Sequence, residues 1–152
     1  MKAVLINPFG VLFNLPLNES TRIKCFAEIN YCKAVLRNQK EFTILNGAME
    51  FEMQVKAAGF RIVNITNANV RDIVKTILQS RDLSSSYVYS IHNNFHSTVE
   101  DIKDYLGITD NEIVIISKRR EDIDYAQKHG IKYVDMNRHN LQEAYNVLNS
   151  IM

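Results

Sequence analysis

The chain has 152 residues, and its 18 lysines and arginines against 17 aspartates and glutamates give a formal net charge of +1. Hydrophobic residues make up 46% and charged residues 23%, a composition typical of globular domains and unlike that of disordered chains. The near-neutral charge argues against a nucleic-acid-binding protein, and no apolar run approaches the ~18 residues of a membrane span. We therefore expect one folded domain over residues 1–152, with neither nucleic acid nor membrane as its partner.

Five short apolar segments, rich in β-branched or aromatic residues, are predicted to be buried strands. In chain order they cover residues 3–6, 61–65, 87–91, 112–116 and 131–134. Between them, amphipathic segments predict helices over residues 49–58, 70–79, 97–106 and 121–129, and a last helix after Asn140.

Several of these helices have recognisable ends. Glycines 59, 107 and 130 follow three of them, Ser97 and Glu100 have the spacing of a capping box, and Asn140 can cap the last helix. Alternating strands and helices joined by short connections favour right-handed crossovers. The pattern predicts an α/β fold with a five-stranded parallel sheet covered by helices on both faces.

Residues 13–46 interrupt this alternation as an insertion after the first strand, and residues 21–37 within it have helical periodicity. About 30 residues are too few to form an independent domain. We expect the insertion either to close a cleft over the sheet or to provide a dimer surface.

Two cysteines, Cys25 and Cys32, lie seven residues apart within this insertion. On a helix they would share one face but lie about 10 Å apart along the axis, beyond the ~7 Å that a disulfide can bridge. The apolar run at the N-terminus is too short for a signal peptide. These features favour reduced thiols and a cytoplasmic protein.

Ligands of open parallel sheets bind beyond the carboxyl ends of the strands, so the residues that follow each strand are the candidates for a site. These residues are 7–10, 66–67, 92–96 and 117–120.

The same segments resemble motifs of the haloacid dehalogenase (HAD) superfamily, most members of which are magnesium-dependent phosphatases. Residues 4–12 (VLINPFGVL) are similar to its first motif, an apolar strand followed by Asp-x-Asp-Gly-(Thr/Val)-Leu. Residues 62–67 (IVNITN) are similar to the second motif, a strand ending in Thr or Ser, and residues 115–122 (IISKRRED) to the fourth, a strand followed by Gly-Asp-x-x-x-Asp. The resemblance implies a three-layer, Rossmannoid HAD-like fold with a minimal helical insertion instead of a cap domain.

The chain departs from these motifs at the positions that carry the family's chemistry. Asn7 stands in place of the nucleophilic Asp, and a neutral carboxamide cannot supply the anionic oxygen that covalent catalysis needs. Phe9 stands in place of the Asp that shuttles a proton, and a phenyl ring exchanges none. His96 falls near the position of the family's lysine, and Lys118 replaces the first metal-holding Asp, whereas Asp122 is retained.

Magnesium binding needs several oxygen ligands, including carboxylates that balance its charge. Lys118 introduces a cation where the ion would lie, and we expect its ammonium group to substitute for the ion by pairing with Asp122. Two positive charges there would repel by several kcal/mol at an effective dielectric near ~20. We therefore expect no metal, no other cofactor and no phosphatase activity by the family mechanism.

Three of these positions have two interpretations each. Asn7 either contacts a ligand or bonds its own backbone, and the Thr66 hydroxyl either donates to an anion or satisfies local backbone. Lys118 lies either on a solvated charged turn or in an anion pocket with His96 and the amides after the first strand. That vestigial phosphate pocket would comprise Asn7, Phe9, Gly10, Thr66, Asn67, His96, Lys118 and Asp122.

Three functions are compatible with the sequence. The first is a catalytically inactive HAD-like domain, a pseudo-phosphatase, that binds a protein partner or a small anionic ligand. The second is an enzyme with altered or residual activity, for which His92, His96 and Asp122 are the groups in reach; the two histidines lack the third ligand that a zinc site needs. The third is a structural subunit of a homodimer or a larger assembly. The missing nucleophile favours the first.

Overall fold

The computed structural model describes residues 2–13, 44–67, 71–84, 86–91 and 93–151. Strands and helices alternate along these residues, as expected. The elements are β1 (Lys2–Ile6), α2 (Ala48–Ala57), β2 (Phe60–Asn67), α3 (Arg71–Ser80), β3 (Val88–Ile91), α4 (Phe95–Leu106), a 3₁₀ turn (Asp110–Glu112), β4 (Ile113–Ser117), α5 (Arg120–His129), β5 (Lys132–Asp135) and α6 (Leu141–Ile151).

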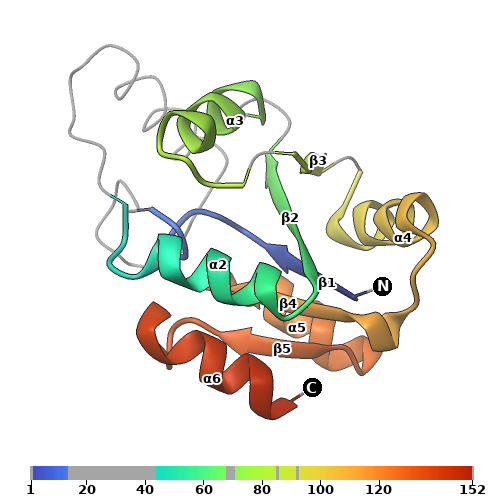
Figure 1. The fold of residues 1–152 in the computed structure, drawn as a ribbon. Helices are drawn as coiled ribbons and strands as arrows, with labels where there is room; N and C mark the ends of the chain where they lie inside the picture. The colour runs from blue at the N-terminus through green and yellow to red at the C-terminus, as the bar shows by residue number, and fades with distance from the viewer. Residues whose placement is uncertain (1, 14–43, 68–70, 85, 92, 152) are drawn as a thin grey trace.

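The five strands form one parallel sheet in the order β3-β2-β1-β4-β5 (Figure 1). β1 lies at its centre, where Ile6 is in register with Asn64 of β2 on one side and with Ile116 of β4 on the other. The predicted parallel sheet is confirmed, and the ends of β1, β2 and β4 meet at one edge.

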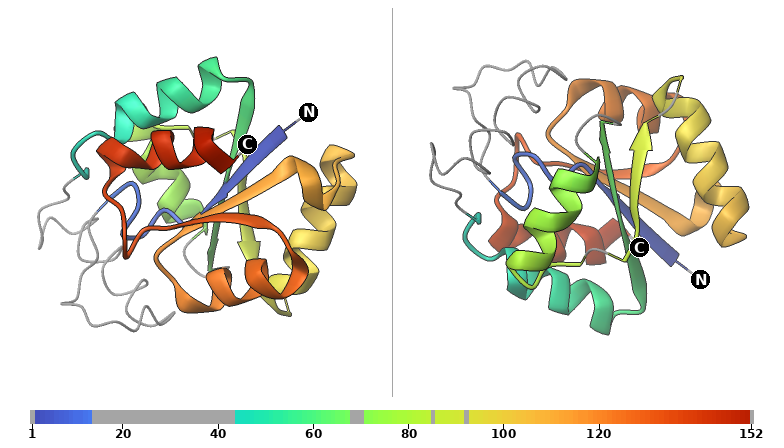
Figure 2. Two further views of the ribbon diagram at one scale, coloured as in Figure 1. Left: turned by 90° about the horizontal axis from the view of Figure 1, so that it is seen from below. Right: turned by 90° about the horizontal axis from the view of Figure 1, so that it is seen from above.

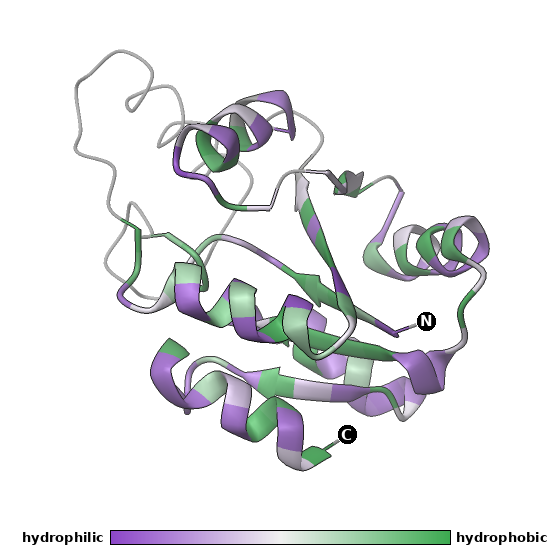
Figure 3. Cartoon of the chain, viewed as in Figure 1, coloured by the Kyte–Doolittle hydropathy of each residue, from purple (hydrophilic) through white to green (hydrophobic). Residues whose placement is uncertain are grey.

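Alternate residues of the strands point to opposite faces of the sheet, and each face carries its own apolar cluster. Val4 and Ile6 pack with α2, α3 and α6, whereas Ala3 and Leu5 pack with α4 and α5. Figure 2 shows these helices on the two sides of the sheet, and Figure 3 shows hydrophobic residues along the central strands. The fold therefore has the three layers that the sequence predicts.

Local chemistry explains where the helices begin and end. Gly107 and Gly130 end α4 and α5 with positive φ values of 68° and 67°, a conformation that glycine adopts without strain. Asn140 caps α6, since its Oδ1 accepts the Glu143 N–H at 2.9 Å. The predicted cap of α4 was wrong by three residues, because Asn94 rather than Ser97 is the cap and accepts the Ser97 N–H at 2.8 Å.

The two ends of the insertion at 13–46 lie side by side. Phe13 and Ile44 form an antiparallel bridge, and the Leu45 N–H donates to the Leu12 carbonyl at 3.0 Å. The predicted helix at 21–37, with Cys25 and Cys32, lies outside the described residues. Among the described helices, none is long and apolar enough to cross a membrane.

Candidate functional site

Three buried polar residues lie near the carboxyl ends of the central strands. Asn7 follows β1, while Thr66 and Ser117 belong to the last residues of β2 and β4. The Asn7 N–H donates to the Ile116 carbonyl at 3.3 Å, which extends the β1–β4 ladder by one residue. All three residues are buried, with 5%, 1% and 0% of their surface exposed. The sheet topology therefore places all three residues at the same end of the sheet.

Asn7 uses its side-chain oxygen inside the chain. Its Oδ1 accepts the N–H of Phe9 at 3.2 Å, two residues further on, which is the local backbone bond typical of asparagine at a turn. The local interpretation of Asn7 is thereby confirmed. The Asn7 side-chain oxygen, which stands in the place of the family's nucleophile, is neutral and already accepts a hydrogen bond.

Phe9 is a core residue. Its side chain is fully buried and meets the Phe13 ring edge-on, with the ring centroids 4.9 Å apart. Both rings belong to the cluster beneath α2 and α6. The expectation that Phe9 lines a ligand pocket was wrong, because a ring with no exposed surface contacts no ligand.

The backbone amides after β1 are also engaged. Gly10 donates its N–H to the Phe13 carbonyl at 2.8 Å, and residues 11–13 donate theirs to the Pro8 carbonyl at 2.9–3.3 Å. An anion-binding turn needs amides that point to a ligand instead of to the chain. The N–H groups of Gly10 and its neighbours therefore do not point into a phosphate pocket, contrary to the expectation from the sequence.

Asp122, in the first turn of α5, is the acidic group of the site and is only 2% exposed. The Ser117 hydroxyl donates to its Oδ2 at 2.7 Å and accepts the Arg119 N–H at 2.9 Å. Burial raises the pKa of the Asp122 carboxyl, and the Arg119 charge, the Ser117 hydroxyl and the Asn7 carboxamide lower it in part. Ser117 thus fixes a buried carboxyl group beneath the strand ends.

Lys118 does not pair with Asp122, which corrects the expectation from the sequence. Its side chain is exposed, and the cation that attracts the carboxylate is that of Arg119, whose side chain is only 16% exposed and also bonds Glu121 at 2.8 Å. The solvated-turn interpretation therefore fits Lys118, and the ion pair that was to replace magnesium is not formed.

His96 lies against α5 and not beside Asn7. Its ring meets Tyr125 edge-on at 5.7 Å and tilts toward His129 at 5.2 Å between centroids. The predicted convergence of His96 with Lys118 on one anion is not found. His92 and the side chain of Asn67 lie outside the described residues.

Two buried oxygens at the site have no hydrogen-bond partner among the described residues. One is Thr66 Oγ1, so its hydroxyl bonds no backbone group of the described residues. The other is Asp122 Oδ1. An unpaired buried polar atom costs about 1–3 kcal/mol, so both atoms favour any group that can bond them.

The residues present do not fit the magnesium ion that the fold family implies. Asp122 offers one free carboxylate oxygen, but the Asn7 oxygen is engaged by an amide and Phe9 has no oxygen in its side chain. Magnesium demands near-octahedral oxygen ligation with carboxylates. In the described part of the chain, no group of three or more His, Cys, Asp or Glu side chains is arranged to hold a metal.

Comparison with known proteins identifies the fold. Neither a known protein family nor any curated protein sequence matches the chain. Among solved structures, it is similar to a dehalogenase (TM-score 0.63, 18% identity, covering 91% of this chain and 86% of the other). It is also similar to a protein from Bacteroides fragilis described as a haloacid dehalogenase-like hydrolase (TM-score 0.64, 10% identity, covering 88% and 86%) and to a hydrolase from Pseudomonas syringae (TM-score 0.60, 13% identity, covering 97% and 90%). The chain therefore has a HAD-like fold, as its motifs predict.

Two residues of the candidate segment 117–120 were given no role from the sequence. Ser117 holds Asp122, and Arg119 supplies the positive charge beside it. A small hydroxyl residue directly after a buried strand was the available signal for Ser117. For Arg119 there was none, because three basic residues follow in succession and the sequence does not say which one turns inward.

Proposed function

We propose that the protein is a catalytically inactive HAD-like domain that acts by binding a protein partner. One observation carries this proposal: the Asn7 oxygen, in the place of the nucleophile, accepts the Phe9 N–H while the Phe9 ring is buried in the core. Attack on phosphorus needs an anionic or activated oxygen with room for the substrate beside it. Here the Asn7 side-chain oxygen is neutral, and the nearby Phe9 ring is packed in the core.

The remaining carboxyl group does not replace the lost chemistry. Asp122 is buried, its carboxyl group accepts the Ser117 hydroxyl, and the Asn7 side chain lies close to that carboxyl group. A general acid or base must reach the proton that it transfers, within about 2.6–3.2 Å. His96, the other titratable group considered, contacts Tyr125 and His129 instead. These placements support a domain kept for binding.

Hydrolysis assays test this proposal. The wild-type protein is incubated with Mg²⁺ and a set of phosphomonoesters, beside the variant Asp122→Asn. We expect both to give the rate of the buffer alone. Turnover that needs Mg²⁺ and is lost in Asp122→Asn would overturn the proposal, since it would show that a working acidic site remains.

A second candidate function is the binding of a small polar ligand at the strand ends, which the unpaired Thr66 Oγ1 and Asp122 Oδ1 favour. Thermal unfolding with phosphate, sulfate and Mg²⁺, each added separately, distinguishes the two candidates. Stabilisation by phosphate or sulfate without Mg²⁺ supports the ligand if it already occurs at low millimolar concentration and grows with the logarithm of that concentration. Stabilisation that appears only at high salt is the general effect of excluded anions and does not count. No response to any of the three supports a pure interaction domain.

A further inference from the structure

The open edge of β5 lies at the bottom of a groove between two helices. Among the described strands, β5 pairs only with β4 and ends the sheet. Viewed from below, β5 crosses between α6 on one side and α5 on the other (Figure 2, left). A cavity of about 590 Å³ lies here, lined by residues of β5, of both helices and of the turn after β5. We call it the β5 groove.

The backbone of β5 offers hydrogen-bonding groups to this groove. The Met136 N–H donates to Ser117 in β4, and successive residues of a strand turn to opposite edges. Tyr133 and Asp135 therefore turn their backbone groups outward. The Asp135 carbonyl accepts the Arg138 N–H at 3.0 Å, which leaves the Tyr133 N–H and carbonyl and the Asp135 N–H for another strand. Such an edge is a template for an added strand.

The two walls of the groove differ in chemistry. On the α5 side stand Arg120 and Tyr133. The Arg120 side chain is 71% exposed and pairs with Asp124 of the same helix at 3.1 Å, and the Tyr133 hydroxyl accepts the Gln127 amide N–H at 2.9 Å. On the α6 side stand Val147 and Ile151, which are partly buried against the core. One wall is basic and aromatic, and the other is aliphatic.

The charge of the groove excludes a second copy as its best occupant. Its ionised lining residues are Arg120, Lys132 and Arg138 against Asp135, an excess of two positive charges with His139 neutral. Two such edges paired face to face would bring like charges together, which opposes association. An acidic segment would meet complementary charge, and exposed guanidinium groups bind carboxylates well.

The geometry points to a partner protein that adds an extended acidic segment to the β5 edge as a sixth strand. Because side chains of a strand alternate, acidic residues of this segment face Arg120 while apolar residues face Val147 and Ile151. Four residues of β5 span about 13 Å, so about four residues of the segment pair with it. This inference names the surface for the proposed interaction role, but it does not depend on catalytic inactivity.

A peptide titration followed by amide NMR spectra of the full chain tests this inference. The probe is a capped hexapeptide of alternating valine and glutamate. Three controls are the same length: alternating valine and lysine, valine and glutamate in two separate blocks, and the probe with N-methyl groups along one edge. We expect saturable shifts at Tyr133 and Asp135 with the probe alone, at up to about millimolar concentration.

Charge-reversal variants locate the contact. Arg120→Glu should weaken binding of the probe at least about threefold, because it replaces an attraction by a repulsion. Lys128→Glu makes the same charge change on α5 outside the groove and should leave binding nearly unchanged. Equal effects of the two variants, equal binding of the lysine peptide, shifts elsewhere on the molecule, or no shift would each overturn the inference. So would concentration-dependent dimers whose interface protects the Tyr133 amide, which would assign the edge to a second copy.

The two proposals fail separately. Phosphomonoester turnover would refute the proposed catalytic inactivity but would not bear on the β5 groove. If no peptide binds the β5 groove, this groove is not the interaction surface. The hydrolysis assay would still test the proposed catalytic inactivity.

Discussion

The Ser117 hydroxyl holds the buried Asp122 carboxyl group, with Ser117 Oγ 2.7 Å from Asp122 Oδ2. Because burial outweighs this bond and the nearby Arg119 charge, the pKa of Asp122 is raised above its ordinary value of 3.8. A raised folded pKa means that the native state binds the proton more tightly than the unfolded chain does. The contribution of Asp122 to stability is therefore fully present below pH 3.8 and is lost as the pH rises through the raised pKa.

Asp122→Asn should remove this pH dependence. At neutral pH the variant avoids burying a charge, so we expect a free energy of unfolding about 1 kcal/mol above that of the wild type, with the two converging at acid pH. Urea unfolding from about pH 4 to about pH 8 measures the difference. Asp124→Asn, on the exposed side of the same helix, is the control and should show little change. Parallel pH curves for Asp122→Asn and the wild type would refute the assignment.

Thr66 and Thr98 form a natural pair for testing the unpaired hydroxyl. Both are 1% exposed, but Thr98 Oγ1 donates to the Asn94 carbonyl at 3.0 Å, whereas Thr66 Oγ1 has no partner among the described residues. Replacing an unpaired hydroxyl by a methyl group removes a desolvation cost, so Thr66→Val should stabilise the protein by about 1 kcal/mol. Thr98→Val should destabilise it by a similar amount. A loss of stability in Thr66→Val would show that its hydroxyl has a partner.

Phe9→Ala tests whether Phe9 is core or faces a site. Truncating this fully buried ring, which packs on Phe13, should lower the free energy of unfolding by about 3–5 kcal/mol, because a cavity remains. Phe95→Ala, which truncates a half-buried ring against Tyr125, should cost clearly less. Chemical denaturation of both variants gives the comparison. If Phe9→Ala costs less than about 1 kcal/mol, the ring borders an open site and the proposed function loses its main support.

A second buried acid, Glu52 on α2, gives an independent test of the electrostatics. It is 3% exposed, its Oε1 accepts the Ser84 N–H at 2.8 Å, and its Oε2 has no partner among the described residues. Burial raises the pKa of Glu52, so its ionised form lowers stability at neutral pH. We expect Glu52→Gln to raise the free energy of unfolding, measured in urea at pH 7, by about 1 kcal/mol, since the amide oxygen still accepts the Ser84 N–H.

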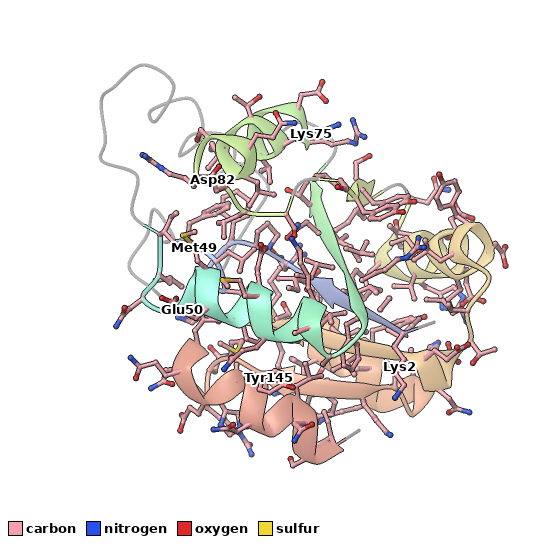
Figure 4. The ribbon with its side chains drawn as sticks, viewed as in Figure 1. Lys2, Met49, Glu50, Lys75, Asp82 and Tyr145 are labelled. Carbon is pink, nitrogen blue, oxygen red and sulfur yellow. The ribbon has the colours of Figure 1, made fainter. Side chains whose placement is uncertain are left out.

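The control for Glu52→Gln lies two residues away on the same helix. Glu50, labelled in Figure 4, is exposed and should tolerate Glu50→Gln with almost no effect. A loss of stability in Glu52→Gln alone would indicate that the ionised carboxylate is bound by a cation, contrary to its raised pKa.

The order and type of the elements could be predicted because the signals are local. Apolar runs marked all five strands, and the glycines at 107 and 130 marked helix ends that need positive φ. The start of α4 was placed at the wrong residue because Asn94 and Ser97 are both good caps. Only the observed Asn94–Ser97 bond decides between them.

The positions of the candidate residues in the fold could be predicted, but their contacts could not. Asn7, Thr66 and Asp122 follow from the strand ends, since topology alone brings those ends together. Which of Lys118 and Arg119 turns toward Asp122 depends on how the chain enters α5, and Ser117 fixes that entry by accepting the Arg119 N–H. That Phe9 packs inward on Phe13 likewise depends on tertiary contacts that no spacing in the sequence reveals.

Hydrolysis of p-nitrophenyl phosphate tests the central claim most directly, when the same preparation is measured with Mg²⁺, with a chelator, and as the variant Asn7→Ala. Asn7→Ala removes the oxygen in the nucleophile's place, so any reaction that uses this position must change in it. We predict that all three samples hydrolyse the ester at the rate of the buffer. Turnover by the wild type that stops with the chelator and in Asn7→Ala would contradict the account.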